Sequence, residues 1–285
     1  SFCIFLSSIT LMVPAAAKKI KEVGVTYVGI SLDGLEDVND AFRGQKGAYA
    51  AAMQGIQNCV AVGQRVGLRF TINAHNVREL DPIFDFIEVE HIDRACFYHL
   101  VYSGRGEAMA EEDVTPEESR AALGTILRRT RDFAARGLKK EILTVDNHCD
   151  GVYLYLTAKA EGNEKLAHSI WEFLSMNGGN RSGIAFGEVD PEGNVHPDQF
   201  TQHHTFGNVR ERKFSEIWRE AKHPILAGLK DRKPLLRGRC ADCRFLSVCN
   251  GNFRTRAEAR TGDFWASDPA CYLTDEEIGL AGDGR

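Results

Sequence analysis

The chain has 285 residues, of which 43% are hydrophobic and 26% are charged, a composition typical of a globular protein with a sizeable core. Its 35 lysines and arginines are outnumbered by 40 aspartates and glutamates, and the net charge of −5 excludes the strongly basic surface of a nucleic-acid-binding protein. The longest apolar stretch, Phe2–Val13, is interrupted by Ser7, Ser8 and Thr10 and is too short for a membrane span. It also lacks a basic leader, so we expect a cytoplasmic protein with neither nucleic acid nor membrane as partner.

The first half of the sequence alternates between predicted strands and helices. The strand segments are rich in β-branched and aromatic residues, and the helical segments place apolar residues at helical spacing. Strands are predicted over Phe2–Leu6, Thr26–Leu32, Val66–Asn73, Ala95–Tyr102 and Ile142–Val145, and helices over Val13–Val23, Ala48–Val62, Val77–Ile87 and Thr115–Arg136. This order predicts a parallel sheet with crossover helices, in which the loops after the strands carry the chemistry.

The pattern changes beyond about residue 140. One helix is predicted over roughly 152–176, then a loop at Gly178–Asn180 and a hairpin that turns at Asp190–Gly193. The rest of the chain is rich in loops and cysteine. We therefore expect an α/β part over 1–145, a bridging segment over 146–180 and a small irregular domain over 181–285.

Four cysteines near the C-terminal end form the most informative motif. Cys240, Cys243, Cys249 and Cys271 have the spacing C-x2-C-x5-C-x21-C. Four thiolates suit a tetrahedral zinc ion or an iron–sulfur cluster. Zinc ribbons usually combine two C-x2-C pairs, and the second pair is missing here, so the spacing favours iron–sulfur while a structural zinc site stays open.

The surroundings of these cysteines are basic. Lysines and arginines here could balance the negative charge of a thiolate cluster or receive carboxylates of a substrate, or they could form an ordinary solvated loop. They are Lys230, Arg232, Lys233, Arg237, Arg239, Arg244, Arg254 and Arg256. Of the other cysteines, we expect Cys3, Cys59 and Cys96 to pack as small apolar residues, and Cys149 beside His148 to be no catalytic pair.

Several segments resemble a known family. GISLDG (Gly29–Gly34), LRFTINAHN (Leu68–Asn76), HLVYSGRG (His99–Gly106) and the four-cysteine segment together resemble radical S-adenosylmethionine (SAM) enzymes with a C-terminal SPASM/twitch iron–sulfur domain. TVDNHCDGVYLYL, DPEGNVHPDQF, HHTFGNVRE and the segment Cys240–Gly279 are similar to the haem d1 biosynthesis group of that superfamily. The resemblance extends from about Pro14 to the end, and its C-terminal third is the most specific part.

The resemblance implies a partial (β/α)6 radical-SAM barrel, TIM-like in its α/β organisation, followed by the small iron–sulfur domain. The family holds its radical-generating cluster with a CxxxCxxC loop after the first strand, and no such spacing occurs in this sequence. We therefore expect a chain truncated at its N-terminus, with the first two β/α units missing, unable to cleave SAM and without assignable catalytic residues. Asp198 stands where the SPASM pattern often has a cysteine, so a single auxiliary [4Fe–4S] cluster is expected, held by the four cysteines.

The resemblance also implies a set of cofactor and substrate residues. The SAM-contacting residues would be Ser31, Asp33, Thr71, Asn73, Asn76 and Ser103. Partners for a tetrapyrrole iron or its propionates would be Arg69, Arg105, His196, His203 and His204. The implied reaction uses a 5′-deoxyadenosyl radical to remove propionates from 12,18-didecarboxysirohaem, with ferredoxin or flavodoxin as electron donor. A haem b synthase-type decarboxylase, a peptide-modifying SPASM maturase and a non-catalytic iron–sulfur or zinc module are the alternatives.

Overall fold

The computed structural model describes residues 4–7 and 12–280, which form two compact units. Unit 1 comprises residues up to Leu100 together with Glu112–Asp146, and unit 2 comprises Val101–Glu111 together with Asn147 onwards. Phe2 and Cys3, part of the first predicted strand, lie outside the described residues. None of the helices in the described part of the chain has the length and apolarity that a membrane span needs.

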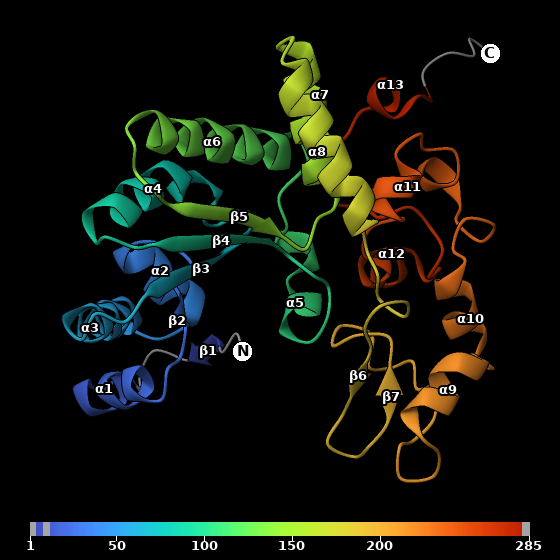
Figure 1. The fold of residues 1–285 in the computed structure, drawn as a ribbon, viewed down its shortest axis with the longest axis horizontal. Coiled ribbons are helices and arrows are strands. Elements are labelled where there is room, and N and C mark those ends of the chain that lie inside the picture. Colours follow the sequence, from blue (N-terminus) through green and yellow to red (C-terminus); the bar gives the residue numbers. More distant parts are fainter. Residues whose placement is uncertain (1–3, 8–11, 281–285) are drawn as a thin grey trace. The chain divides into compact units, whose positions relative to one another are not determined.

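Unit 1 is built on one parallel sheet of five strands (Figure 1). The strands are β1 (Ile4–Ser7), β2 (Tyr27–Ser31), β3 (Val66–Ile72), β4 (Arg94–His99) and β5 (Glu141–Val145), and each neighbours the next in chain order. Right-handed crossovers between successive neighbours place all the connecting helices on one face of the sheet. This is the organisation of a partial (β/α) barrel, and the predicted fold class is confirmed.

The connecting helices of unit 1 agree with the predictions except at one place. They are α1 (Pro14–Glu22), α2 (Glu36–Arg43), α3 (Ala48–Ala61), α4 (Leu80–Val89) and α6 (Pro116–Ala135), with the 3-10 turn η2 (Val77–Glu79) before α4. Helix α6 begins at a capping box, in which the side chains of Thr115 and Glu118 each accept a hydrogen bond from the other residue's backbone N–H. Helix α2 was not predicted, because its eight residues EDVNDAFR bury only Asn39, and the pair Val38 and Phe42 is too short an apolar pattern to indicate a helix.

The two faces of this sheet differ in polarity. Val28, Ile30, Leu68, Phe70 and Phe97 pack against the helices and are almost fully buried, and the rings of Phe84 and Phe97 stack with centroids 5.2 Å apart. Because side chains alternate along a strand, the residues between them face the other way. Those residues include Ser31 opposite Arg69 and Thr71 opposite Tyr98 in the strand register. The sheet therefore presents a polar, half-buried face of the kind that lines a barrel interior.

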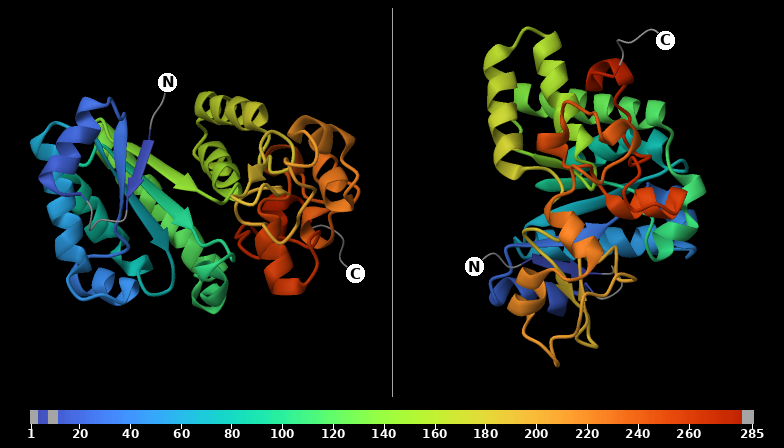
Figure 2. Two further views of the ribbon diagram at one scale, coloured as in Figure 1. Left: turned by 90° about the horizontal axis from the view of Figure 1, so that it is seen from below. Right: turned by 90° about the vertical axis from the view of Figure 1, so that its right-hand side faces the viewer.

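Unit 2 begins with a pair of helices where one long helix was predicted. α7 (Cys149–Ala160) and α8 (Glu164–Asn177) are separated by Gly162, whose φ of +70° is left-handed, and α8 begins at the N-cap Asn163. The expectation of one helix over 152–176 is therefore wrong, because a single Glu-Gly-Asn turn reverses an otherwise continuous apolar pattern. Figure 2 shows the two helices running side by side.

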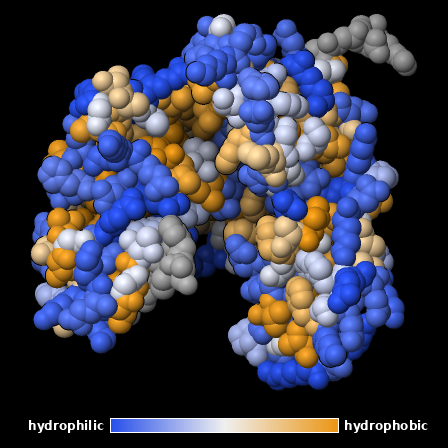
Figure 3. Space-filling model, viewed as in Figure 1, coloured by the Kyte–Doolittle hydropathy of each residue, from blue (hydrophilic) through white to orange (hydrophobic). Residues whose placement is uncertain are grey.

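The remainder of unit 2 consists of short elements joined by loops. The hairpin β6 (Glu188–Val189) and β7 (Val195–His196) is antiparallel and turns where predicted. The helices are α5 (Arg105–Ala108), α9 (Phe214–Glu220), α10 (Pro224–Lys230), α11 (Leu246–Cys249), α12 (Arg254–Thr261) and α13 (Asp275–Ile278), with 3-10 turns η3 (Ala110–Glu112, at the unit boundary) and η4 (Gly238–Cys240). Hydrophilic residues cover most of the face seen in Figure 3, with smaller hydrophobic areas between them.

Candidate metal centre and strand-end sites

The four predicted ligand cysteines converge on one cavity of unit 2. Cys240, Cys243, Cys249 and Cys271 all line it, although they come from the turn η4, the loop after it, the end of α11 and the loop before α13. Much of the remaining wall is apolar and includes Val152, Phe245, Leu246, Leu273 and Ile278. An apolar lining of this kind limits the access of water to a bound cluster and so affects its reduction potential.

Local backbone geometry holds these cysteines in place. The Phe245 N–H donates to Sγ of Cys243 at 3.4 Å, and the Cys240 N–H donates to Oγ of Ser267 at 3.2 Å. The carbonyl of Cys249 accepts from the Asn180 N–H at 3.1 Å. Gly179 makes that approach possible, because a Cβ there would lie 2.2 Å from the Cys249 carbonyl.

The spacing of the thiols bears on the choice between zinc and a cluster. Tetrahedral zinc with Zn–S bonds of about 2.3 Å places its sulfurs about 3.8 Å apart. Among the described residues, three ligand atoms within 4.8 Å of one another occur only in a group of two histidines and a glutamate, and no three of the four cysteine sulfurs meet that limit. In the described part of the chain the four sulfurs therefore do not form a preformed zinc tetrahedron.

A fifth thiol lines the same cavity, which the sequence analysis did not anticipate. Cys149 is buried at the start of α7, and a hydrogen bond from it is the main cause that lowers the pKa of Cys271 to about 7. Burial raises the pKa of Cys149 itself and that of Cys249. No local spacing in the sequence links Cys149 to the other thiols, because Cys271 follows it by 122 positions. The only sequence feature near Cys149 is the polar segment 146–150 around it.

A network of asparagines fixes the turn that carries Cys149. Asn147 donates to the Ala270 carbonyl at 2.9 Å, and its Oδ1 accepts from Nδ2 of Asn252 at 2.7 Å and from Sγ of Cys149 at 3.0 Å. The Tyr272 hydroxyl donates to Asp150 at 2.8 Å. The turn before α7 and the first turn of α7 are thus bonded to the residues on either side of Cys271, namely Ala270 and Tyr272.

In unit 1, three of the predicted SAM-contacting residues form a buried polar network at the ends of β2 and β3. The Asp33 carboxylate accepts from the Thr71 N–H at 2.7 Å and pairs with Arg43. Burial raises the pKa of Asp33, against the lowering effects of Arg43 and of the Thr71 hydrogen bonds. Asn76 donates to the Asp33 carbonyl at 3.0 Å and to the Thr71 carbonyl at 2.8 Å. The side chains of Asp33 and Asn76 thus bond to backbone groups at the ends of β2 and β3 and hold these ends together.

Asn73 also belongs to this network, and Ser31 does not. Asn73 is fully buried, donates to the Thr71 carbonyl at 3.0 Å and accepts from the His75 N–H at 2.9 Å. Ser31 and Arg69 lie half-buried on the polar face of the sheet, where Arg69 donates to the Tyr98 hydroxyl at 3.2 Å and its guanidinium carbon lies 4.7 Å from the ring centroid. The structure therefore places Ser31 and Arg69 together on the polar face of the sheet.

The other predicted binding residues belong to unit 2. Ser103 lines a cavity of about 490 Å³, and Arg105 is exposed in the first turn of α5. His196 is buried, and both its ring nitrogens are engaged, Nδ1 with the His204 carbonyl and Nε2 with Asp190, each at 3.1 Å. This geometry gives His196 a role in holding the hairpin.

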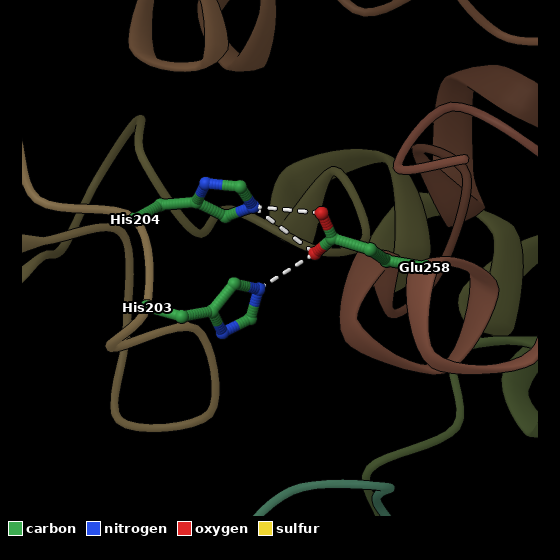
Figure 4. A group of neighbouring side chains, drawn as sticks. All are labelled: His203, His204 and Glu258. Carbon is green, nitrogen blue, oxygen red and sulfur yellow. Dashed lines mark hydrogen bonds and ion pairs between the residues drawn. The ribbon is translucent and has the colours of Figure 1, made fainter. Parts of the chain in front are cut away.

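His203 and His204 converge on one carboxylate (Figure 4). Nε2 of His203 lies 2.8 Å from Oε2 of Glu258, and Nε2 of His204 lies 2.9 Å from Oε1. Glu258 comes from α12, 54 residues further along the chain than His204, and no sequence pattern linked it to the histidine pair.

Comparisons with known proteins agree with this architecture. Residues 186–244 match the SPASM family, described as an iron–sulfur cluster-binding domain. The chain is 58% identical over 273 residues to Fe-coproporphyrin III synthase of Methanosarcina barkeri and 41% identical over 275 residues to pre-haem d1 synthase of Dinoroseobacter shibae. These alignments cover 95% and 96% of the chain and 68% of each relative.

Solved structures share the fold at low sequence identity. The structure of anSMEcpe with bound AdoMet and a Cp18Cys peptide matches with a TM-score of 0.68 at 14% identity, over 98% of this chain and 73% of that one. SuiB of Streptococcus suis bound to S-adenosylmethionine matches with a TM-score of 0.65 at 15% identity, over 95% and 59%. With the two close relatives, this shows that the chain belongs to the radical SAM enzymes that carry a C-terminal SPASM iron–sulfur domain and act in haem biosynthesis.

Proposed function

We propose that the chain binds an iron tetrapyrrole and that Cys240, Cys243, Cys249 and Cys271 hold one auxiliary [4Fe–4S] cluster. The observation that carries the cluster assignment is the convergence of these four thiols on one largely apolar cavity of unit 2. Two residues of the cluster-binding C-x2-C pair, Cys240 and Cys243, lie within the matched SPASM segment. In this family the cofactors supply an electron and a 5′-deoxyadenosyl radical that removes hydrogen from the substrate.

Protein groups around the cavity suit a thiolate cluster. The Phe245 N–H donates to Sγ of Cys243, which stabilises negative charge on that sulfur. Arg239 lines the cavity and donates to the carbonyls of Cys271, at 3.4 Å, and Leu273. Its guanidinium thus provides positive charge next to the thiolates and fixes the loop that carries Cys271.

SAM and substrate would contact the polar face of the unit 1 sheet. Ser31 offers a hydroxyl there, and the buried network of Asp33, Thr71, Asn73 and Asn76 fixes the strand ends around it. We propose Arg69 as a partner for a propionate, because the ring of Tyr98 holds its guanidinium on this face. Ferredoxin or flavodoxin would be the electron donor.

Two products are considered. The C-terminal motifs by themselves favour the haem d1 branch, in which two propionates leave 12,18-didecarboxysirohaem, and the relative at 41% identity is named for that branch. The relative at 58% identity is named Fe-coproporphyrin III synthase, so formation of Fe-coproporphyrin III is the first candidate and the haem d1 reaction the second.

Binding experiments test this proposal. The cluster-loaded chain is titrated anaerobically with 12,18-didecarboxysirohaem while the Soret absorption is followed, and we expect saturable binding of one tetrapyrrole per chain, weakened in Arg69→Ala. Fe-coproporphyrin III should displace the ligand if it is the product, and it should fail to do so if the haem d1 reaction is the correct one. Absence of saturable binding would contradict a tetrapyrrole function.

A further inference from the structure

We propose that His203, His204 and Glu258 form a binding site for a divalent cation of the iron(II)–zinc(II) type, separate from the four-cysteine cavity. The three side chains bring two imidazole nitrogens and one carboxylate together, with all three ligand atoms within 4.8 Å of one another (Figure 4). Two histidines and one carboxylate form a common protein ligand set for zinc and for non-haem iron. Nothing in the proposed tetrapyrrole function depends on this site.

The loop that carries the histidines is built to hold them. Asp198 is buried and accepts from the Phe200 N–H and the Thr201 hydroxyl, each at 2.9 Å, and the His204 N–H donates to the Thr201 carbonyl at 3.0 Å. The buried His196 bonds the His204 carbonyl on the other side. Supporting contacts of this kind fix the direction of ligands before a metal binds.

The carboxylate comes from an equally fixed element. Glu258 lies on α12, which Arg256 anchors through a fully buried ion pair with Asp268 at 2.9 Å. The ring of Phe264 packs edge-on against His204 with centroids 5.2 Å apart. Donors on both sides of the site are therefore supported by buried residues, although His203 itself is exposed.

The adjoining cavity favours a cation over an anion. His203 and Glu258 line the cavity of about 490 Å³, together with Glu107, Ser103 and Thr255. Two carboxylates and no lysine or arginine are among its lining residues, so a propionate would meet like charge there. The cavity also gives an ion access to two of the three donor residues, His203 and Glu258.

The geometry also distinguishes a free ion from the iron of a tetrapyrrole. A macrocycle occupies the equatorial positions of its iron and leaves one axial position on each face, so it can accept one donor from one side. Here three donor atoms lie within 4.8 Å of one another, a set that a free ion can bind together but an iron held in a macrocycle cannot. Under this proposal, His203 and His204 bind a free ion, whereas the family resemblance implied contact with a tetrapyrrole iron or its propionates.

Cobalt(II) provides a direct probe. The full chain is loaded with its iron–sulfur cluster under anaerobic conditions so that the ligand cysteines are occupied, desalted, and titrated with Co²⁺ alone. We expect one Co²⁺ per chain with visible bands of nitrogen and oxygen ligation and without a thiolate charge-transfer band, and displacement by Zn²⁺. Glu258→Gln and His204→Ala should weaken binding at least about tenfold.

A matched control is available on α8. His168 and Glu172 form an exposed pair at 3.3 Å without a third ligand, so His168→Ala should leave Co²⁺ affinity unchanged. Circular dichroism and cluster absorption report folding, and the exposed His203→Ala provides a variant with little structural risk. The proposal would be overturned if the parent chain bound no Co²⁺ or if its spectrum showed thiolate ligation alone. It would also be overturned if folded His203→Ala and Glu258→Gln bound Co²⁺ as tightly as the parent chain does.

Discussion

Arg256 and Asp268 form an ion pair at 2.9 Å with both side chains fully buried. The Asp268 carboxylate also accepts hydrogen bonds from the backbone N–H groups of Phe253 and Ala270, each at 2.9 Å. The backbone carbonyl of Asp268 accepts from the Cys271 N–H at 3.2 Å. The pair thus connects α12 to the loop that presents one of the proposed cluster ligands.

Removing one partner of this pair should destabilise the chain strongly. Asp268→Ala leaves a buried guanidinium without its counter-charge, and we expect a loss of about 3–5 kcal/mol in the free energy of unfolding. Urea unfolding measures it. Arg212→Ala removes an exposed ion pair with Glu220 and should cost about 1 kcal/mol or less. Similar losses of unfolding free energy in Asp268→Ala and Arg212→Ala would show that the buried pair contributes no more to stability than an exposed one.

The ligand assignment predicts a contrast between cysteines. Cys240→Ala and Cys249→Ala should lose the visible absorption of the auxiliary cluster and most of its iron, because each removes one of four thiolates. Cys59→Ala is the control, since Cys59 packs in the core of unit 1. Iron content after anaerobic reconstitution is the measurement, and an unchanged value in Cys240→Ala would contradict the assignment.

Stability should depend on pH through His148. Burial and the charge of Arg256 lower the pKa of His148 to about 4, below its ordinary value of 6.5, so the unfolded chain binds the proton more readily. Stability from the neutral ring is present above pH 6.5 and is lost as the pH falls toward 4, by about 1–3 kcal/mol. Urea unfolding at several pH values should show a flatter dependence for His148→Gln, and an identical slope would argue against this cause.

SAM binding should depend on the polar face of the unit 1 sheet. Ser31→Ala removes a half-buried hydroxyl at the end of β2, and we expect SAM affinity to fall about five- to tenfold, the effect of one hydrogen bond. Equilibrium dialysis with labelled SAM measures this. Ser169→Ala on the exposed face of α8 should bind as the parent chain does, and equal affinities in both variants would remove Ser31 from the site.

Sequence reasoning succeeded where local patterns determine structure. The strands β2 and β3 lie within the predicted segments because their apolar residues alternate with polar ones or form short β-branched runs. The capping box at Thr115 fixes the start of α6 in the same local way. Such signals depend on neighbours only a few residues apart.

The missed features depend on distant contacts or on single turns. Glu258 meets His203 and His204 only because α12 folds back on the loop after β7, and Cys149 meets Cys271 only through the tertiary structure. The break between α7 and α8 depends on the single left-handed Gly162. No spacing rule applied to one sequence reveals contacts of this kind.

The most direct test of the auxiliary cluster is a count of iron, acid-labile sulfide and zinc per chain after anaerobic purification and reconstitution. Four thiols that line one largely apolar cavity predict about four iron and four sulfide per chain, and little zinc bound to cysteine. Zinc bound at the cysteines without sulfide would contradict the cluster and make the four-cysteine cavity a structural zinc site.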